Sequence, residues 1–504
     1  MLAGLSGPAS ASPITVLERD GRAVTREDPY LPPASPVDVP AGALAPARAP
    51  HAGAVAAARK TVPGELRRLL DAQAIDQAHH DRWRTAFDDA RRTWRRLRGA
   101  RRTALGSVIR TTQDVAASGR LTASRAPALF LTLERNRAWW GGGPLLAAGR
   151  RVSFAGSRLV WQHYPGHGLQ IQWLGTFGKA NGLFQSTEHD PELRQLLDEA
   201  APLAAQRAGG IAWEYLFPFD GGRPPWASAM AQGTAMQAYS RAAIRLREPR
   251  YFEVARSAMG IFRTAPPQGV RITTDAGAHY LIYSSLPKLR VLNAFVQALN
   301  GLLDFARLAN DAEGRALFEQ GERELRRALP RYDTGAWSMY STSRESDLGY
   351  HTLVRDFLRG LCQRLTDVRD RQPAVPEAGT PDTGGVAPTG PRPEVPDPAL
   401  YCDTATRFTG YLREKPELEL RTTRLREAVT GKLRFSLSKV STVSITVLRG
   451  GRVVEARTLR LGGGQRAIGL RPSKAGPLTV RLRAVDLAGN AGAVQRVVRV
   501  APKR

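Results

Sequence analysis

The spacing of hydrophobic positions changes several times along the chain, and each change predicts a change of secondary structure. Between residues 63 and 110, apolar side chains recur every three to four positions among many arginines, which predicts a pair of amphipathic basic helices. Residues 151–184 alternate β-forming and polar side chains around the sequence YPGHG, which predicts hairpin strands. From residue 191 to 365 the helical spacing returns in six segments with short connections.

Helical hairpins repeated in this way, with Ala and Gly available for close contacts, are typical of an α/α toroid or incomplete barrel. After residue 417 the pattern changes to short alternating strands separated by Gly, Ser and Asn, which predicts a β-sandwich. Its DLAGN turn resembles bacterial Ig-like domains. The expected organisation of this mainly α protein is a disordered leader or remnant signal region (1–55), a basic helical region (56–150), a β-hairpin element (151–190), an α/α domain (191–413) with a Pro-rich insertion (368–398), and an Ig-like β-sandwich (417–501).

The Pro-rich insertion separates the only two cysteines of the chain, Cys362 and Cys402. Their number is too small for a disulfide scaffold, and their spacing is not that of a metal site. They could form one bridge that closes the insertion as a loop, or they could be buried thiols in a reducing compartment. We expect neither a metal nor a cofactor.

The balance of charge favours a polyanionic partner. Lys and Arg number 73 against 46 Asp and Glu, which gives a formal net charge of +27. The basic residues are mainly Arg spread along the chain, as in proteins of GC-rich genomes, and no RNA-binding aromatic motif, zinc-finger spacing or phosphate loop accompanies them, which argues against nucleic acid. The arginines of residues 91–102 could form a solvated helix face, which we favour, or a docking surface.

The chain contains no run of about 18 apolar residues, which argues against a membrane-spanning helix. Its first residues, MLAGLSGPASASP, look like the end of an apolar stretch followed by an Ala-x-Ala cleavage site. We therefore expect a secreted or cell-surface protein with a truncated signal peptide.

Several motifs occur in the order found in the D-glucuronyl C5-epimerase family: YPGHGLQIQ with FGKAN, WEYLFPFDGGRPPWASAMAQGTA, VLNAFVQALNGLLDF, LPRYDTG and DLGYHT. The chain resembles that family over residues 152–412, and its catalytic helical domain over Trp213–Leu358. The resemblance implies inversion of C5 in the glucuronate residues of an acidic, heparosan-like or glycosaminoglycan polysaccharide. A homodimer is left open.

Inversion at this carbon makes two chemical demands. Cationic or hydrogen-bonding groups must stabilise the carbanion next to the carboxylate, and one group must take the proton from one face while another returns it to the opposite face. The resemblance assigns these proton transfers to Tyr283, to Tyr332 beside Arg331, and to Tyr350 beside His351. The alternative for each tyrosine is packing at a helix junction.

Other positions of the family motifs suggest contacts with the sugar chain. Trp213, Glu214 and Trp226 could contact sugars, or they could be packing tryptophans beside a buried ion pair. Gln232 could reach a sugar hydroxyl, although with Gly233 it more simply lets two helices approach. The other expected substrate-binding residues are Arg331, His351, Tyr340, Glu345, Lys179, Asn181 and Tyr164.

The sequence departs from the family in stretches that matter for the chemistry. Where the family has WYEEYP, this chain has His279 to Ser284, HYLIYS, so both carboxylates before Tyr283 are missing. Glu345 is the best local replacement. Three hypotheses follow: a uronyl C5-epimerase, a lyase that eliminates the 4-linked sugar from the same carbanion, and a non-catalytic polysaccharide-binding protein.

Overall fold

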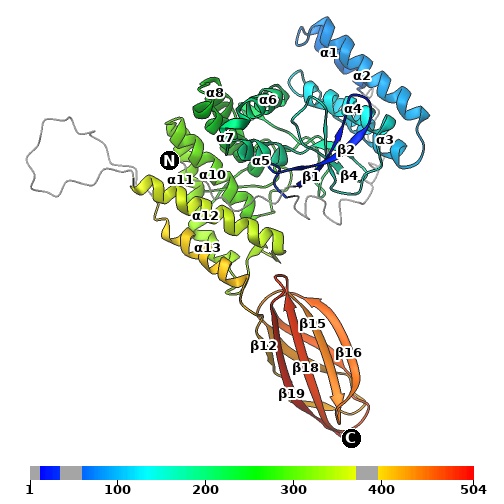
Figure 1. Ribbon diagram of the computed structural model, residues 1–504, viewed down its shortest axis with the longest axis vertical. Coiled ribbons are helices and arrows are strands. Elements are labelled where there is room, and N and C mark those ends of the chain that lie inside the picture. The colour runs from blue at the N-terminus through cyan, green and yellow to red at the C-terminus, as the bar shows by residue number, and fades with distance from the viewer. Residues whose placement is uncertain (1–11, 34–59, 371–395, 504) are drawn as a thin grey trace, which may run out of the picture. The chain divides into compact units, whose positions relative to one another are not determined.

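The structure is a computed structural model that describes residues 12–33, 60–370 and 396–503 (Figure 1). The chain forms two compact units: unit A holds the residues up to Arg290 and Gln297–Glu324, and unit B holds Val291–Val296 and the residues from Leu325 onward. Most of the predicted Pro-rich insertion, the remnant signal region and the end of the leader lie outside the described residues. The predicted domain boundaries stay predictions.

Unit A contains a five-stranded sheet in the order β2-β1-β3-β4-β5. Its first strand, β1, is antiparallel to β2 and parallel to β3, with Val16 opposite both Val24 and Ser153. The expectation of a disordered leader is therefore wrong for residues 12–33, because β1 and β2 form a hairpin and β1 also pairs with β3. The strands are β1 (Ser12–Leu17), β2 (Ala23–Asp28), β3 (Arg151–Phe154), β4 (Trp161–Tyr164) and β5 (Gly168–Ile171).

Four helices lie between β2 and β3 in the chain, and their apolar stripes form a core as the spacing predicted. Leu66, Trp83 and Phe87 are buried. Asp76 caps the second helix by accepting a hydrogen bond from the His79 N–H at 2.8 Å. The arginines of this helix are mostly exposed, which supports the solvated-face interpretation. The helices are α1 (Val62–Asp71), α2 (Gln77–Arg96), α3 (Gly99–Ala117) and α4 (Ala126–Gly142).

The hairpin predicted for residues 151–184 ends earlier than expected. Strands β4 and β5 form it, but Trp173–Leu183 is helix α5 instead of a strand. The side chain of Gln172 caps this helix by accepting from the Gly175 N–H at 2.8 Å. Among its buried residues, Trp173, Thr176, Phe177, Ala180 and Leu183 recur at helical spacing.

The remaining helices of unit A follow the predicted helical segments. Helices α7 and α10 pack closely at Gly233 and Gly301: a Cβ on Gly301 would lie 2.0 Å from the Gly233 carbonyl oxygen. The predicted role of Gly233 in close helix packing is therefore confirmed. The elements are α6 (Asp190–Ala200), β6 (Ala205–Arg207), β7 (Gly210–Ala212), α7 (Ala229–Arg245), α8 (Arg250–Ser257), α9 (Gly260–Arg263), β8 (Arg271–Thr273), β9 (Ala278–Tyr280), α10 (Leu292–Leu308) and α11 (Ala312–Ala328), of which α10 and α11 contribute residues to both units.

Unit B begins with a helical part. A disulfide joins Cys362 to Cys402, so the bridge that the sequence left open is present. It connects α12 (Leu348–Asp370) to α13 (Ala399–Tyr411), which follow the short strands β10 (Met339–Ser341) and β11 (Arg344–Glu345).

The rest of unit B consists of strands, as predicted, and forms two sheets around one core that includes Phe435, Val443 and Leu482. We call these strands the C-terminal sheets. Their orders are β12-β14-β17 and β13-β19-β18-β15-β16. The strands are β12 (Leu418–Leu420), β13 (Arg424–Arg426), β14 (Gly431–Leu437), β15 (Ser441–Arg449), β16 (Arg452–Leu461), β17 (Gly464–Leu470), β18 (Gly476–Asp486) and β19 (Ala491–Ala501).

We predict that replacing both cysteines, Cys362→Ser with Cys402→Ser, lowers the free energy of unfolding of unit B by about 4 kcal/mol, because the bridge shortens the unfolded chain. The bridged residues are 40 positions apart. Urea unfolding followed by circular dichroism measures the change, and wild-type protein with reducing agent should match the variant. An unchanged midpoint in both would show that the bridge does not constrain the unfolded chain.

Candidate functional site

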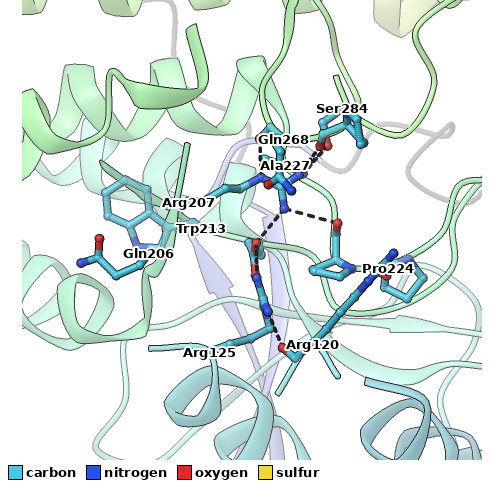
Figure 2. A network of polar contacts seen from close by, with 12 residues as sticks. Arg120, Arg125, Gln206, Arg207, Trp213, Pro224, Ala227, Gln268 and Ser284 are labelled. Carbon is cyan, nitrogen blue, oxygen red and sulfur yellow. Dashed lines mark hydrogen bonds and ion pairs between the residues drawn. The ribbon is translucent and has the colours of Figure 1, made fainter. Parts of the chain in front are cut away.

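A buried carboxylate organises the loops of unit A (Figure 2). One residue separates Glu214 from the end of strand β7, and the Glu214 side chain is only 2% exposed. Arg125 donates to one of its oxygens through Nε at 2.5 Å, and Arg207 donates to the other through Nη1 at 2.7 Å. Two buried cations thus share one anion, and backbone carbonyls accept hydrogen bonds from several of their other N–H groups.

The network of Glu214 extends to the residue that follows the candidate Tyr283. Arg207 also donates to the Ser284 hydroxyl at 3.3 Å and to the Gln268 carbonyl at 2.6 Å (Figure 2). Ser284 in turn exchanges two hydrogen bonds with Ala227: its hydroxyl accepts from the Ala227 N–H at 3.0 Å, and its N–H donates to the Ala227 carbonyl at 2.9 Å. The backbone at Tyr283 is therefore fixed by its neighbour.

Aromatic rings surround Tyr283 in unit A. Its ring centroid lies 5.0 Å from Trp226 and 5.5 Å from Phe219, both edge to face. Trp226 stacks on Tyr215 at 4.2 Å. Tyr164 of β4 reaches the same cluster through Phe217, with centroids 4.7 Å apart. Of the expected residues, the structure thus brings Tyr164, Trp226 and Tyr283 into one aromatic cluster.

His167 also belongs to this cluster, although the sequence analysis did not select it. Its ring lies 5.6 Å from Phe217, in the turn of the YPGHG motif. Burial lowers the pKa of His167 below its ordinary value, and the charge of Arg110 lowers it further. The signal that could have found it is a histidine between two turn glycines within a family motif.

Two expected substrate-binding residues of unit A have packing contacts instead. Trp213 stacks on Tyr239 at 5.4 Å and meets Phe177 edge to face at 4.7 Å, and its ring is buried. Gln232 donates to the carbonyls of Ile211 at 2.8 Å and Ala258 at 3.0 Å. These contacts support the packing interpretation of both residues, since a sugar would have to displace them.

Lys179 and Asn181 lie on helix α5 rather than on a strand. Lys179 forms an ion pair of 2.7 Å with Asp28 of β2, on the wall of a cavity of about 450 Å³. Asn181 donates to the Thr234 carbonyl at 3.2 Å and accepts from Arg241 at 3.0 Å. Both side chains therefore connect α5 to other parts of unit A.

In unit B, two of the expected tyrosines contact each other. The ring centroids of Tyr340 and Tyr350 are 4.7 Å apart. The guanidinium of Arg344 lies over the Tyr340 ring, 4.1 Å from its centroid. Arg344 is a residue that the sequence analysis missed, and its position four residues after Tyr340 in a short hairpin is the signal that could have indicated it.

The neighbours of Tyr350 fix the start of α12. The Asp347 carboxylate accepts a hydrogen bond from the Tyr350 N–H at 2.9 Å, as helix caps do. The buried His351 accepts at Nδ1 from the Ser338 N–H at 3.2 Å and donates from Nε2 to the Phe408 carbonyl at 2.8 Å, a tautomer assigned from these partners. These contacts make His351 an anchor of the helix.

Burial lowers the pKa of His351 to about 4, and it does so more strongly than the other groups around the ring. The Phe408 carbonyl and Asp333 oppose this change, whereas Arg355 and Lys439 add to it. His351 is therefore neutral at physiological pH.

Tyr332 is also next to an anchored residue. The Asp333 carboxylate accepts from the Gly335 N–H at 2.9 Å, from the Tyr411 hydroxyl at 3.0 Å and from Arg407 at 3.1 Å. The predicted structural role of Asp333 in a tight turn is confirmed, and Tyr332 beside it is buried.

Two further residues of unit B that were expected to bind substrate are Arg331 and Glu345. Arg331 is exposed. Glu345, the proposed replacement acid, accepts a hydrogen bond from the Gly463 N–H at 2.9 Å, in the turn between β16 and β17. That contact gives Glu345 a structural partner.

Over residues 12–33, 60–370 and 396–503, no cluster of three His, Cys, Asp or Glu side chains is arranged to hold a metal ion. In the same parts of the chain, the helices are too short or too polar to cross a membrane.

Comparison with known proteins finds relatives of the segment that holds Tyr283, Tyr332 and Tyr350. Residues 208–368 match the family described as D-glucuronyl C5-epimerase C-terminus. A D-glucuronyl C5-epimerase of Caenorhabditis elegans is 32% identical over 130 residues, which is 23% of this chain and 21% of that protein. An uncharacterized protein of Methanocaldococcus jannaschii, MJ1128, is 26% identical over 149 residues, which is 28% of this chain and 48% of that protein.

The chain thus spans about a fifth of the length of the first relative and about half of the second. A solved structure of a sugar epimerase from a ruminal bacterium is 10% identical, with 48% of this chain and 58% of that chain covered at a TM-score of 0.32, which is too low to support a conclusion. The tyrosine-bearing segment, residues 208–368, is thus similar to the C-terminal part of the D-glucuronyl C5-epimerase family.

We predict that Glu214→Gln lowers the free energy of unfolding by about 3–5 kcal/mol, because Arg125 and Arg207 would remain buried without their counter-charge. Urea unfolding measures this loss. The matched control is Glu253→Gln, which breaks an ion pair whose carboxylate is 69% exposed and should cost less than about 1 kcal/mol. Equal losses for both variants would contradict the role of the buried network.

A second prediction concerns pH. Since the pKa of His351 is about 4 in the folded protein and about 6.5 in an unfolded chain, the unfolded state binds the proton first as the pH falls. Stability from this group is therefore complete above about pH 6.5 and decreases as the pH falls towards 4. Thermal unfolding of His351→Gln should depend less on pH across this window than wild type. Equal slopes for wild type and His351→Gln would contradict the prediction.

Proposed function

We propose that this protein is a uronyl C5-epimerase-like enzyme that inverts C5 of glucuronate residues in an acidic polysaccharide. The observation that carries the proposal is the family match of residues 208–368, which includes Tyr283, Tyr332 and Tyr350. One phenol would take the C5 proton and another would return a proton from the opposite face. No cofactor is needed for this exchange.

Within unit A for Tyr283, and within unit B for Tyr332 and Tyr350, the surroundings of each tyrosine suit a reaction that needs fixed geometry. Each is adjacent in the chain to a residue whose polar atoms are held by several partners: Ser284, Asp333 and His351. Proton transfer to and from carbon requires the acid and base to be positioned before the substrate arrives. If the tyrosines served only to pack the core, their rings would be needed, but the hydrogen-bonded neighbours Ser284, Asp333 and His351 would not.

Positive charge beside Tyr340 and Tyr350 supports the same chemistry. The C5 carbanion lies next to a carboxylate, so negative charge accumulates in the transition state, and a nearby guanidinium stabilises it. Arg344, over the Tyr340 ring, would supply that charge. We propose Arg344 as an addition to the substrate-binding residues.

The missing carboxylates before Tyr283 favour a second candidate, a non-catalytic protein that binds acidic glycans. The buried Leu281 and Ile282 stand in their place. The nearby His279 is also buried, and burial lowers its pKa to about 3, so it carries no charge near neutral pH. The lyase hypothesis shares the first proton transfer and is separated by its 4,5-unsaturated product.

The finer features of the fold and location are part of this proposal. We propose that the helical segments form an α/α toroid and that the C-terminal sheets are an Ig-like sandwich. The disulfide between Cys362 and Cys402 supports export, because disulfides persist in oxidising compartments.

The proposal predicts deuterium incorporation at C5 when the protein acts on a glucuronate polymer in heavy water. Tyr332→Phe and Tyr350→Phe should reduce this exchange by roughly 10²- to 10⁴-fold, the usual contribution of general acid–base groups. NMR measures the exchange, and absorbance of an unsaturated product would instead identify a lyase.

The control is Tyr251→Phe, which removes a hydroxyl that donates to Asp198 at 2.9 Å in unit A. It should exchange like wild type. Absence of exchange with every uronate polymer tested, together with retained binding, would favour the non-catalytic candidate.

A further inference from the structure

We propose that the C-terminal sheets bind the acidic polysaccharide through an arginine-bearing face of their five-stranded sheet. The choice of a uronate polymer as the occupant rests on the proposed function. The surface itself follows from the charge distribution and the strand register. We call this surface the arginine face, and its residues are Arg460, Arg481, Arg483, Arg499, Thr442, Ser444, Thr446, Thr458 and Thr479.

Positive charge is concentrated in this part of the chain. Residues 417–504 hold 19 Lys and Arg and five Asp and Glu, so 14 of the 27 net positive charges lie on 88 of 504 residues. A composition bias of the genome would spread arginine evenly over the chain. The concentration therefore indicates a property of the C-terminal sheets themselves.

The alternation of the strands determines which side chains share the outer face. Val480, Leu482 and Ala484 of β18 point into the core, so Arg481 and Arg483 between them point outward. Both arginines are exposed. By the same alternation Arg499 of β19 lies on this side, since Val498 and Val500 are core residues.

The register brings the arginines next to hydroxyl groups. Arg483 is opposite Ser444 of β15, and Ser444 is opposite Thr458 of β16. Arg460 is two residues along β16 and opposite Thr442. In Figure 1 the strands β15, β16, β18 and β19 lie in one sheet. The face thus combines cations for carboxylates with hydroxyls that can bond sugar hydroxyl groups.

Acidic side chains do not neutralise this face. Among the described residues of the C-terminal sheets, the ion pairs are Arg421–Glu419, Arg457–Glu455 and Lys439–Asp486, and each lies away from the arginine face. The Gln495 amide oxygen that accepts from Arg481 Nε at 3.0 Å is neutral and leaves the positive charge in place. A surface of one sign attracts a polymer of the opposite sign.

The chemistry of the face favours an acidic glycan over nucleic acid. Single-stranded nucleic acids are bound largely by aromatic rings that stack on bases. Residues 417–504 contain one aromatic residue, Phe435, and it is buried in the core. Hydroxyl and guanidinium groups without aromatic rings suit a chain of hydroxyls and carboxylates.

The test uses the full-length protein with Arg460→Ala, Arg481→Ala and Arg483→Ala combined. The matched control is Lys432→Ala, Arg434→Ala and Lys474→Ala, which removes the same charge from exposed positions outside the face. The probes are a long unsulfated glucuronate–N-acetylglucosamine polymer, neutral dextran and double-stranded DNA. Affinity electrophoresis measures binding, and circular dichroism verifies that both variants fold.

We expect the face variant to bind the glucuronate polymer roughly tenfold or more weakly in ~0.1 M salt, because each lost contact also loses counterion release. The control should bind like wild type, and dextran should not bind. Equal losses in both variants would overturn the proposal, because net charge alone would then explain binding. Tighter binding of DNA than of the polymer would also overturn it.

Deuterium exchange on a short glucuronate oligosaccharide separates this inference from the proposed function. If the face variant binds the polymer as tightly as wild type and exchanges normally, the arginine face is overturned and the proposed function is not. Polymer binding that depends on the face, without exchange in wild type, overturns the proposed reaction and leaves the binding surface in place.

Discussion

The buried carboxylate of Glu214 is the constraint on which the loops of unit A depend. Removing a carboxylate from water costs several kcal/mol, and the interaction repays this cost only where cations and hydrogen bonds surround it. Arg125 and Arg207 supply both, and the carbonyl groups that accept their other N–H groups belong to loops far apart in the sequence. Satisfying one charge therefore fixes several loops together, including the segment that ends at Ser284.

Unit B also contains a buried ion pair whose hydrogen bonds hold separate segments together. The buried Lys439 forms an ion pair with Asp486 at 3.3 Å and donates to the Tyr411 carbonyl at 2.7 Å. This arrangement attaches the C-terminal sheets to the end of α13. The neutral His351, both of whose ring nitrogens form hydrogen bonds, fixes α12 in unit B. A buried polar group that finds all its partners specifies one arrangement, because any other arrangement leaves it unsatisfied.

These anchors bear on the proposed chemistry. Carbon acids as weak as a uronate C5–H need a base, an acid and a cation held in place, and flexible side chains would lose that advantage. Ser284, Asp333 and His351 each hold the backbone next to a candidate tyrosine. The loss of the two carboxylates before Tyr283 makes the positioned phenols and Arg344 the groups on which the proposed reaction depends.

The sequence by itself determined features that depend on neighbouring residues. Helical spacing located α7, α10 and α12, alternation located the C-terminal strands, and the Asp-x-Gly sequence at Asp333 identified a turn, because local backbone geometry fixes each of these periods. The order of the motifs was enough to indicate the family of residues 208–368.

Only the tertiary structure decided features that depend on distant partners. The local hairpin of β1 and β2 joins the larger sheet only because the distant β3 pairs with Thr15–Leu17. Trp213 could have stacked on a sugar, but Tyr239 and Phe177 cover its ring. Arg481 and Arg483 join Ser444 and Thr458 on one face only through strand register. In each case the deciding contact comes from a residue that is remote in the sequence, and no local pattern records it.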